Sequence, residues 1–165
     1  MTPRVTDLVV GRWGARFLGR TFPCALGRGG IGEKRGEGDG ITPRGLWHVG
    51  AVMARPDRGG VPPGARPIGP RDLWSDDPAD PAYNSAVRAP HPQSHEALRR
   101  PDGLYDLVAV LDYNWPVAVA GAGSAIFLHV WRGPRKPTAG CVAFRRADLG
   151  WILSRWSPRS RVIIR

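Results

Sequence analysis

The sequence has few cysteines, few lysines and no long apolar run. Cys24 and Cys141 are the only two cysteines, too few for the disulfide framework of a small secreted domain. No segment approaches the roughly 18 consecutive apolar residues of a membrane helix, and the N-terminal segment lacks the apolar core of a secretory signal. Taken at face value, these absences predict a soluble chain that is not exported.

Basic residues are abundant, but Lys34 and Lys136 are the only lysines among the 24 basic residues. The net charge is +10, with seven basic residues in 1–35 and nine in 132–165. A positive surface attracts nucleic acid, anionic lipid or a carboxylate-rich substrate. A nucleic-acid-binding β-domain therefore stays open as an alternative, although no aromatic stacking pattern or recognised binding motif favours it.

Glycine (22 residues) and proline (17 residues) are frequent and argue against long helices. Short β-like runs separated by turns recur along the chain. Residues 146–156, "RADLGWILSRW", instead show the i, i+3, i+4, i+7 apolar spacing of an amphipathic helix. The sequence predicts one mostly-β domain over residues 1–165, a β-sandwich or barrel with long loops and one or two short helices.

Four segments carry more specific expectations. The glycine-rich segment 27–45 is expected to form no regular element, and it lacks the GxxxxGK[ST] pattern of a phosphate-binding loop. The polar segment 73–100 is long enough that we expect it to be functional or to cover something. Within it, "SHEAL" (94–98) predicts a helical turn capped by Ser94. The closing "RVIIR" (161–165) predicts an edge strand.

The stretch "HVWRGPRKPTAGCVAF" (129–144) places a histidine and a cysteine near the ends of two strands. The Gly/Pro-rich link between them predicts a hairpin-type connection, with the strands about 4.8 Å apart. If His129 and Cys141 face the same side, the imidazole can take the thiol proton or stabilise the thiolate. The alternative is that both are buried residues of an ordinary β-structure.

Residues next to the cysteine fit the same chemistry. Backbone N–H groups around Ala139, Gly140 and Cys141 are candidates for an oxyanion hole. Thr138 is a candidate for orienting the histidine or binding substrate. Nearby cations would lower the thiol pKa and bind substrate carboxylates; these are Arg132, Arg135, Lys136, Arg145 and Arg146.

These motifs together resemble the L,D-transpeptidase (YkuD-type) catalytic domain, in a compact proteobacterial branch. The resemblance is carried by His129, by Thr138-Ala139-Gly140-Cys141-Val142 and by "KRGEGDGITPRGLW" (34–47). It runs from about Cys24 to the last residue. It implies a β-rich fold, Cys141 as nucleophile and His129 as base and later acid.

The resemblance also implies the partners of the protein. Peptidoglycan stem peptides would be donor and acceptor, with no cofactor, metal, nucleic acid or membrane span, in a monomer at the periplasm or cell wall. The compact branch implies 1→3 links between L-Ala and diaminopimelate rather than 3→3 links. An L,D-carboxypeptidase or amidase that uses water as acceptor stays open.

The chain departs from the family pattern at three points. Many relatives have His where this chain has Ala139, and Asn or Arg where it has Ala143. The interval of twelve residues from His129 to Cys141 is also shorter than in common members. These departures affect the expected donor specificity rather than the nucleophile.

Weaker expectations concern residues outside the motif. Four residues of the polar segment are candidates for lining a substrate groove, and each is equally well explained as a surface or packing residue: Trp74, Tyr83, Asn84 and His95. Gly38, Asp39 and Thr42 are expected to shape a loop near the site. Cys24 is expected to be a buried structural thiol.

Overall fold

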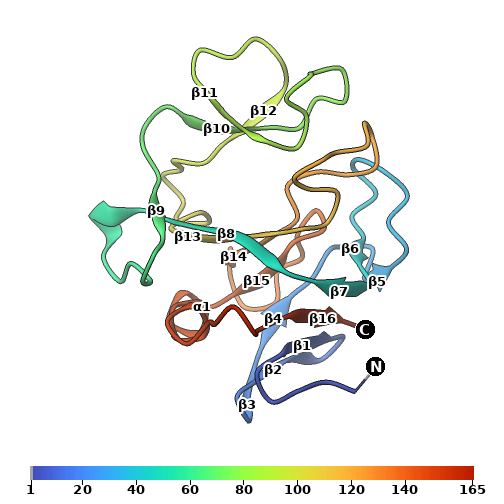
Figure 1. Ribbon diagram of the computed structural model, residues 1–165, viewed down its shortest axis with the longest axis vertical. Helices are drawn as coiled ribbons and strands as arrows, with labels where there is room; N and C mark the ends of the chain where they lie inside the picture. The colour runs from blue at the N-terminus through green and yellow to red at the C-terminus, as the bar shows by residue number, and fades with distance from the viewer. Residues whose placement is uncertain (1) are drawn as a thin grey trace.

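The structure is a computed structural model that describes residues 2–165, and it consists of stacked β-sheets with one α-helix (Figure 1). The first layer is a five-stranded sheet of order β3-β2-β1-β16-β7. Its strands are β1 (Leu8–Gly11), β2 (Gly14–Phe17), β3 (Arg20–Phe22), β7 (Gly45–Trp47) and β16 (Val162–Ile164).

The middle layer is a six-stranded sheet of order β4-β15-β14-β13-β8-β9. Its strands are β4 (Cys24–Ala25), β8 (Val49–Ala54), β9 (Arg66–Pro67), β13 (Leu107–Leu111), β14 (Phe127–Val130) and β15 (Val142–Phe144). The α-helix α1 (Arg146–Leu153) directly follows β15, and the 3-10 helix η1 (Pro56–Arg58) follows β8.

The third layer is a three-stranded sheet of order β11-β10-β12, formed by β10 (Asp72–Ser75), β11 (Ala86–Arg88) and β12 (His95–Ala97). In Figure 1 it lies above the six-stranded sheet, with the five-stranded sheet below. A small parallel pair, β5 (Ile31–Gly32) and β6 (Thr42–Pro43), lies within the glycine-rich segment.

The middle sheet is apolar on both faces. All five residues of β13 are buried, and successive side chains of a strand point to opposite faces. Leu107, Ala109 and Leu111 therefore join a first core with the five-stranded sheet and α1, whereas Val108 and Val110 join a second core with the three-stranded sheet. A strand covered on both faces reads as a continuous apolar run, as "LVAVL" does.

The mostly-β fold is confirmed, and the only α-helix among residues 2–165 lies inside the segment with helical periodicity. Three local predictions are wrong. The glycine-rich segment 27–45, expected to form no regular element, contains the paired strands β5 and β6. "SHEAL" is not a helical turn, since His95–Ala97 pairs with β10 and this pairing outweighs the local Ser94 cap. "RVIIR" does not form an edge strand, because β16 lies between β1 and β7.

The connection between the strands of His129 and Cys141 also differs from its prediction. The two strands are neighbours, but β14 and β15 pair in parallel, with His129 opposite Ala143. A parallel pair cannot be joined by a hairpin. The link 131–141 instead runs back along the sheet to the start of β15.

Candidate active site

The parallel register places His129 and Cys141 on the same face of the middle sheet. Cys141 lies two residues before Ala143, the partner of His129, so the two side chains point the same way. Cys141 belongs to the second core, and the His129 ring packs edge-on against Tyr105 of that core at 5.4 Å. Both residues line one cavity of about 160 Å³. The sheet thus brings together the residues that the motif pairs.

The loop before the cysteine is fixed by the glycine-rich segment. The Thr138 N–H donates to the Leu26 carbonyl and the Thr138 carbonyl accepts from the Arg28 N–H, both at 2.9 Å. Gly27 lies between them, and a Cβ there would come within 2.0 Å of the Gly40 carbonyl oxygen. The backbones pass so closely that only glycine fits at this position.

The Thr138 side chain shapes the turn into the cysteine. Its hydroxyl donates to the Cys141 carbonyl at 2.7 Å and accepts from the Gly140 N–H at 3.1 Å. Gly140 has φ of +148°, and a Cβ there would lie 2.9 Å from the Ile41 carbonyl oxygen. Because the Gly140 N–H already has a partner, the N–H groups of Ala139 and Cys141 are the better candidates for an oxyanion hole.

The Cys141 thiol is held within the backbone of the segment before β14. Its Sγ donates to the Ala125 carbonyl at 3.1 Å and accepts from the Phe127 N–H at 3.4 Å. Ala125 has φ of +53°, and its N–H donates to the Asn84 side-chain oxygen at 2.9 Å. Burial raises the pKa of Cys141 to about 12. The resting sulfur is therefore a protonated thiol at neutral pH.

His129 is also uncharged. Its Nδ1 lies 2.8 Å from the Val130 carbonyl oxygen, and since a carbonyl only accepts, Nδ1 carries the proton and Nε2 keeps its lone pair. Burial lowers the pKa of His129 to about 4. The site therefore holds a neutral thiol and a neutral imidazole rather than an ion pair, and the Val130 carbonyl sets the tautomer of the ring.

The candidate groove residues of the polar segment lie outside the cavity. Trp74 is buried against Phe127, and its indole N–H donates to the Asn84 side chain at 3.0 Å. Tyr83 is buried, bonds to Glu37 through its hydroxyl and accepts from the Gly123 N–H at 3.0 Å. These residues support the segment that holds the thiol.

The remaining candidate of that segment, His95, is exposed on β12, and its Nδ1 bonds to the Gln93 carbonyl at 2.7 Å. The three-stranded sheet as a whole covers the second core, which contains Cys141. The expectation that the long polar segment covers something is therefore met, and the Trp74 side chain is part of that cover.

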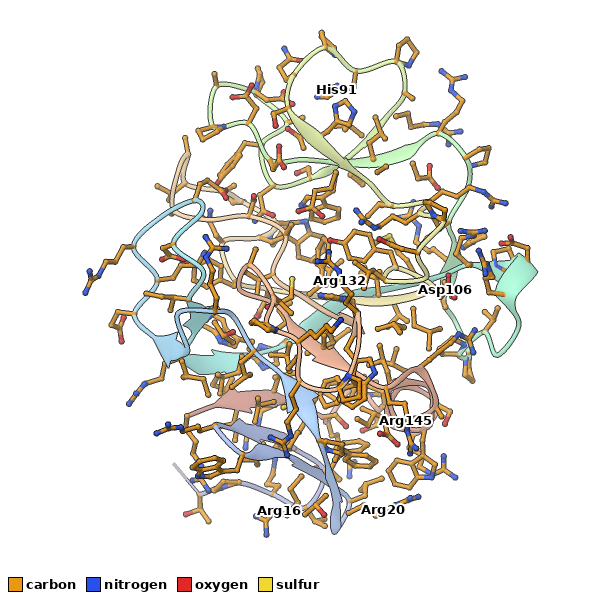
Figure 2. All side chains as sticks on the ribbon, turned by 180° about the vertical axis from the view of Figure 1, so that it is seen from behind. Arg16, Arg20, His91, Asp106, Arg132 and Arg145 are labelled. Atoms are coloured by element: carbon orange, nitrogen blue, oxygen red, sulfur yellow. The ribbon has the colours of Figure 1, made fainter. Side chains whose placement is uncertain are left out.

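The cations predicted to lie near the site separate into two groups. Arg132 and Lys136 line the cavity, whereas Arg135 donates to the Trp13 carbonyl at 3.1 Å and lines a different groove. Arg145 forms an ion pair with Asp148 at 2.8 Å at the start of α1. Figure 2 shows Arg132 at the middle of the molecule and Arg145 beside the helix.

Three further residues line the cavity that the sequence patterns did not single out: Arg100, Leu104 and Tyr105. Tyr105 is buried, and its hydroxyl bonds to Glu96. Arg100 ends the polar segment 73–100, and Leu104 and Tyr105 lie just before the strongly apolar strand β13. Within residues 2–165, no cluster of His, Cys, Asp and Glu is arranged to hold a metal ion. No helix in that range has the length and apolar character needed to cross a membrane.

Comparison with known families matches residues 11–164 to YkuD, the L,D-transpeptidase catalytic domain. The match spans nearly the whole chain and includes the cavity. Searches of curated proteins and of solved structures found no match.

Proposed function

Because this chain belongs to the YkuD family of L,D-transpeptidase catalytic domains, we propose that it is a single catalytic domain that cross-links peptidoglycan through a thioester on Cys141. The family makes the protein a cysteine-dependent acyltransferase of the cell wall. The observation that carries the residue assignment is the shared cavity, which His129 and Cys141 line together.

In the proposed reaction, the Cys141 sulfur attacks a carbonyl carbon of the donor stem peptide, and its proton passes to His129 Nε2. Collapse of the tetrahedral intermediate breaks the peptide bond, and His129 returns the proton to the departing amine. The result is a thioester. An amine of the acceptor stem, on a diaminopimelate side chain, then attacks the thioester carbonyl, loses a proton to His129 and regenerates the thiol.

The electrostatics of the resting site support general-base activation rather than a preformed thiolate. The pKa of Cys141 is raised and that of His129 is lowered, both by burial, so an ion pair is disfavoured before substrate arrives. The thiol proton is engaged by the Ala125 carbonyl. Attack therefore requires Sγ to leave this bond and turn its proton toward the imidazole.

We further propose that the product is a 1→3 link between L-Ala and diaminopimelate. This rests on the resemblance to the compact branch and on the short link between the two catalytic residues. Ala139 stands where many relatives have His. It is exposed and lines the cavity, where its small side chain leaves more room for substrate than a histidine would. Cell-wall location follows from the same substrate and takes precedence over the expectation, drawn from the N-terminal segment, that the chain is not exported.

The test is incubation of the purified protein with a disaccharide-tetrapeptide, followed by mass spectrometry. Dimers support transfer, and fragmentation of the dimer distinguishes a 1→3 from a 3→3 link. Trimmed monomers without dimers would instead assign the protein as an L,D-carboxypeptidase or amidase with water as acceptor. Absence of any product at substrate saturation would contradict the proposed reaction.

A further inference from the structure

We propose that Lys34 supports the reaction by providing a fixed, buried positive charge that stabilises the Cys141 thiolate as it forms. This inference rests on the proposed role of Cys141 as the nucleophile. Lys34 is the first residue of the segment 34–47, and no other part of the mechanism uses it.

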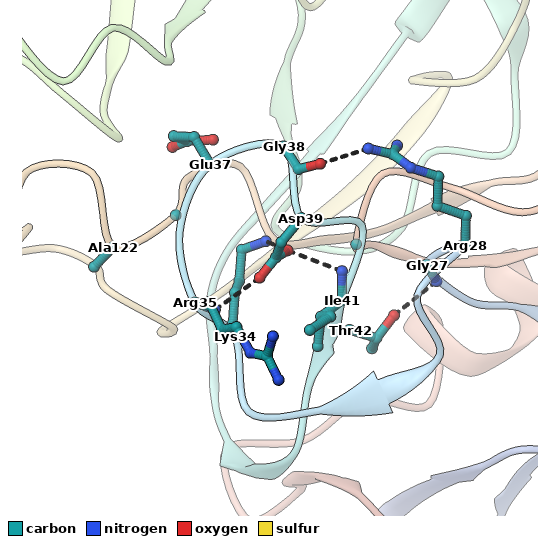
Figure 3. Close-up of polar contacts among 12 residues, drawn as sticks. Gly27, Arg28, Lys34, Arg35, Glu37, Gly38, Asp39, Ile41, Thr42 and Ala122 are labelled. Atoms are coloured by element: carbon teal, nitrogen blue, oxygen red, sulfur yellow. Dashed lines mark hydrogen bonds and ion pairs between the residues drawn. The ribbon is translucent and has the colours of Figure 1, made fainter.

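Lys34 is buried and has a single acidic partner. Its side chain is 3% exposed, and Nζ forms an ion pair with the Asp39 carboxylate at 2.6 Å. The carboxylate also accepts from the N–H groups of Arg35 at 2.7 Å and Ile41 at 2.9 Å (Figure 3). Three donors therefore fix Asp39, and Asp39 in turn fixes the ammonium. Burying such a pair is costly unless its geometry is well satisfied.

Two glycines make room for Lys34 beside the thiol. A Cβ on Gly123 would come within 2.4 Å of Lys34 Cε, and a Cβ on Gly140 would lie 3.6 Å from Lys34 Nζ. Gly140 immediately precedes Cys141, and Gly123 lies two residues before Ala125, whose carbonyl accepts the thiol proton. The lysine is thus inserted between the two backbone segments that hold the sulfur.

The charges that act on Cys141 are opposed. Burial is the dominant effect and raises the pKa of the thiol. The Phe127 N–H lowers it, the Glu96 carboxylate raises it, and the Lys34 ammonium lowers it. Tyr105 and the neutral His129 complete the titratable surroundings. Arg132 and Lys136 are exposed at the cavity rim, where solvent and salt screen their charges. The remaining lining cation, Arg100, is paired with Asp102.

Alkylation of Cys141 by iodoacetamide tests this charge directly, in a Cys24→Ala background that leaves one thiol. Below the thiol pKa, the alkylation rate is proportional to the thiolate fraction. The key variant is Lys34→Met combined with Asp39→Asn, which removes both charges together and keeps one oxygen that can accept from the Arg35 or the Ile41 N–H group. Arg88→Met combined with Asp72→Asn, which removes an ion pair of the three-stranded sheet outside the cavity lining, is the matched control.

We expect the double variant to react about tenfold more slowly at every pH from 7 to 9, which corresponds to a rise of about one unit in the thiol pKa. The Arg88→Met, Asp72→Asn control should retain the parent rate. A change that merely loosens the packing would expose the sulfur and raise the rate. An unchanged or raised rate in a folded double variant would overturn the proposal.

If circular dichroism shows that the double variant does not fold, Lys34→Arg takes its place. This substitution keeps the charge, so a rate within about threefold of the parent is expected, and a tenfold loss would count against a role of charge. The alkylation rate reports on the thiol alone. Cross-linking that survives Cys141→Ala would instead remove the proposed function, so the two failures are distinguishable.

Discussion

Cys24 and Cys141 belong to the same region of one sheet and face opposite cores. Cys24 lies on β4 opposite Phe144 of β15 and joins the first core, whereas Cys141 precedes β15 and joins the second. Both thiols are free, and burial raises the pKa of Cys24 to about 11 and that of Cys141 to about 12. The resting pKa therefore does not distinguish the Cys141 thiol from the Cys24 thiol.

The surroundings of the two thiols do differ. Cys141 lines a cavity with His129 and has a backbone carbonyl and an N–H group as partners. Cys24 is packed among apolar residues of the first core. The candidate nucleophile is therefore distinguished by the cavity that it lines and by a neighbouring proton acceptor. Its resting pKa does not distinguish it, and the thiolate has to form during the reaction.

The largest expected contrast is between substitutions of the two cysteines. Cys141→Ala should lower dimer formation from disaccharide-tetrapeptide by on the order of 10³-fold or more, because the thioester cannot form. Cys24→Ala, the matched control, should leave the rate nearly unchanged. Quantifying dimers by mass spectrometry checks both. A comparable loss of dimer formation in the two variants would contradict the proposal that only Cys141 is the nucleophile.

His129→Gln removes the imidazole that lies on the same face of the sheet as Cys141 and is proposed to accept the thiol proton. The expected loss of rate is on the order of 10²–10⁴-fold, since no base remains for the thiol proton. In the parent protein, the rate should fall on the acid side near pH 4, because the lowered pKa keeps His129 neutral above that value. An acid limb near 6.5 in the pH–rate profile would show that the imidazole is not desolvated.

Two phenylalanines offer a stability test of the same comparison. Phe127 and Phe144 are fully buried, in the second and the first core respectively. Each Phe→Ala change should lower the free energy of unfolding by about 3–5 kcal/mol. Iodoacetamide labelling should then become faster at Cys141 in the Phe127 variant and at Cys24 in the Phe144 variant. Equal labelling of both thiols in each variant would mean that the two cores open together.

The smallest expected effect is the pH dependence of stability. The folded-state pKa of His129 is lowered to about 4 from 6.5, so the unfolded chain binds more protons between these values. Stability should therefore rise with pH from 4 to 6.5 and level off above, with a contribution of about 3 kcal/mol. Urea unfolding at pH 5, 6 and 7 measures this slope, and His129→Gln should flatten it. A slope that persists in the variant must come from other groups.

Much of this arrangement follows from sequence pattern. The apolar run at 107–111 becomes a doubly buried strand, and the helical spacing at 146–156 contains α1, because periodicity reports which faces are covered. The His–Cys motif required His129 and Cys141 to share a face, and the register of β14 and β15 provides it.

Other features depend on contacts between distant segments. The parallel direction of β15 is set by its place between β14 and β4, and "RVIIR" becomes an interior strand because β1 and β7 pair on either side of it. The burial of Trp74 and Asn84 depends on a sheet that only tertiary pairing creates. No local property of "SHEAL" signals that β10 will recruit it as a strand.

The parallel pairing of β14 and β15 has a consequence for how this protein can vary. The link 131–141 must return along the sheet in eleven residues, close to the shortest crossover that parallel neighbours allow. Deletions there would break the pairing of β14 with β15, whereas insertions would lengthen only the loop beside the cavity. The link between the two proposed catalytic residues, His129 and Cys141, can therefore become longer without loss of the sheet, but it cannot become much shorter.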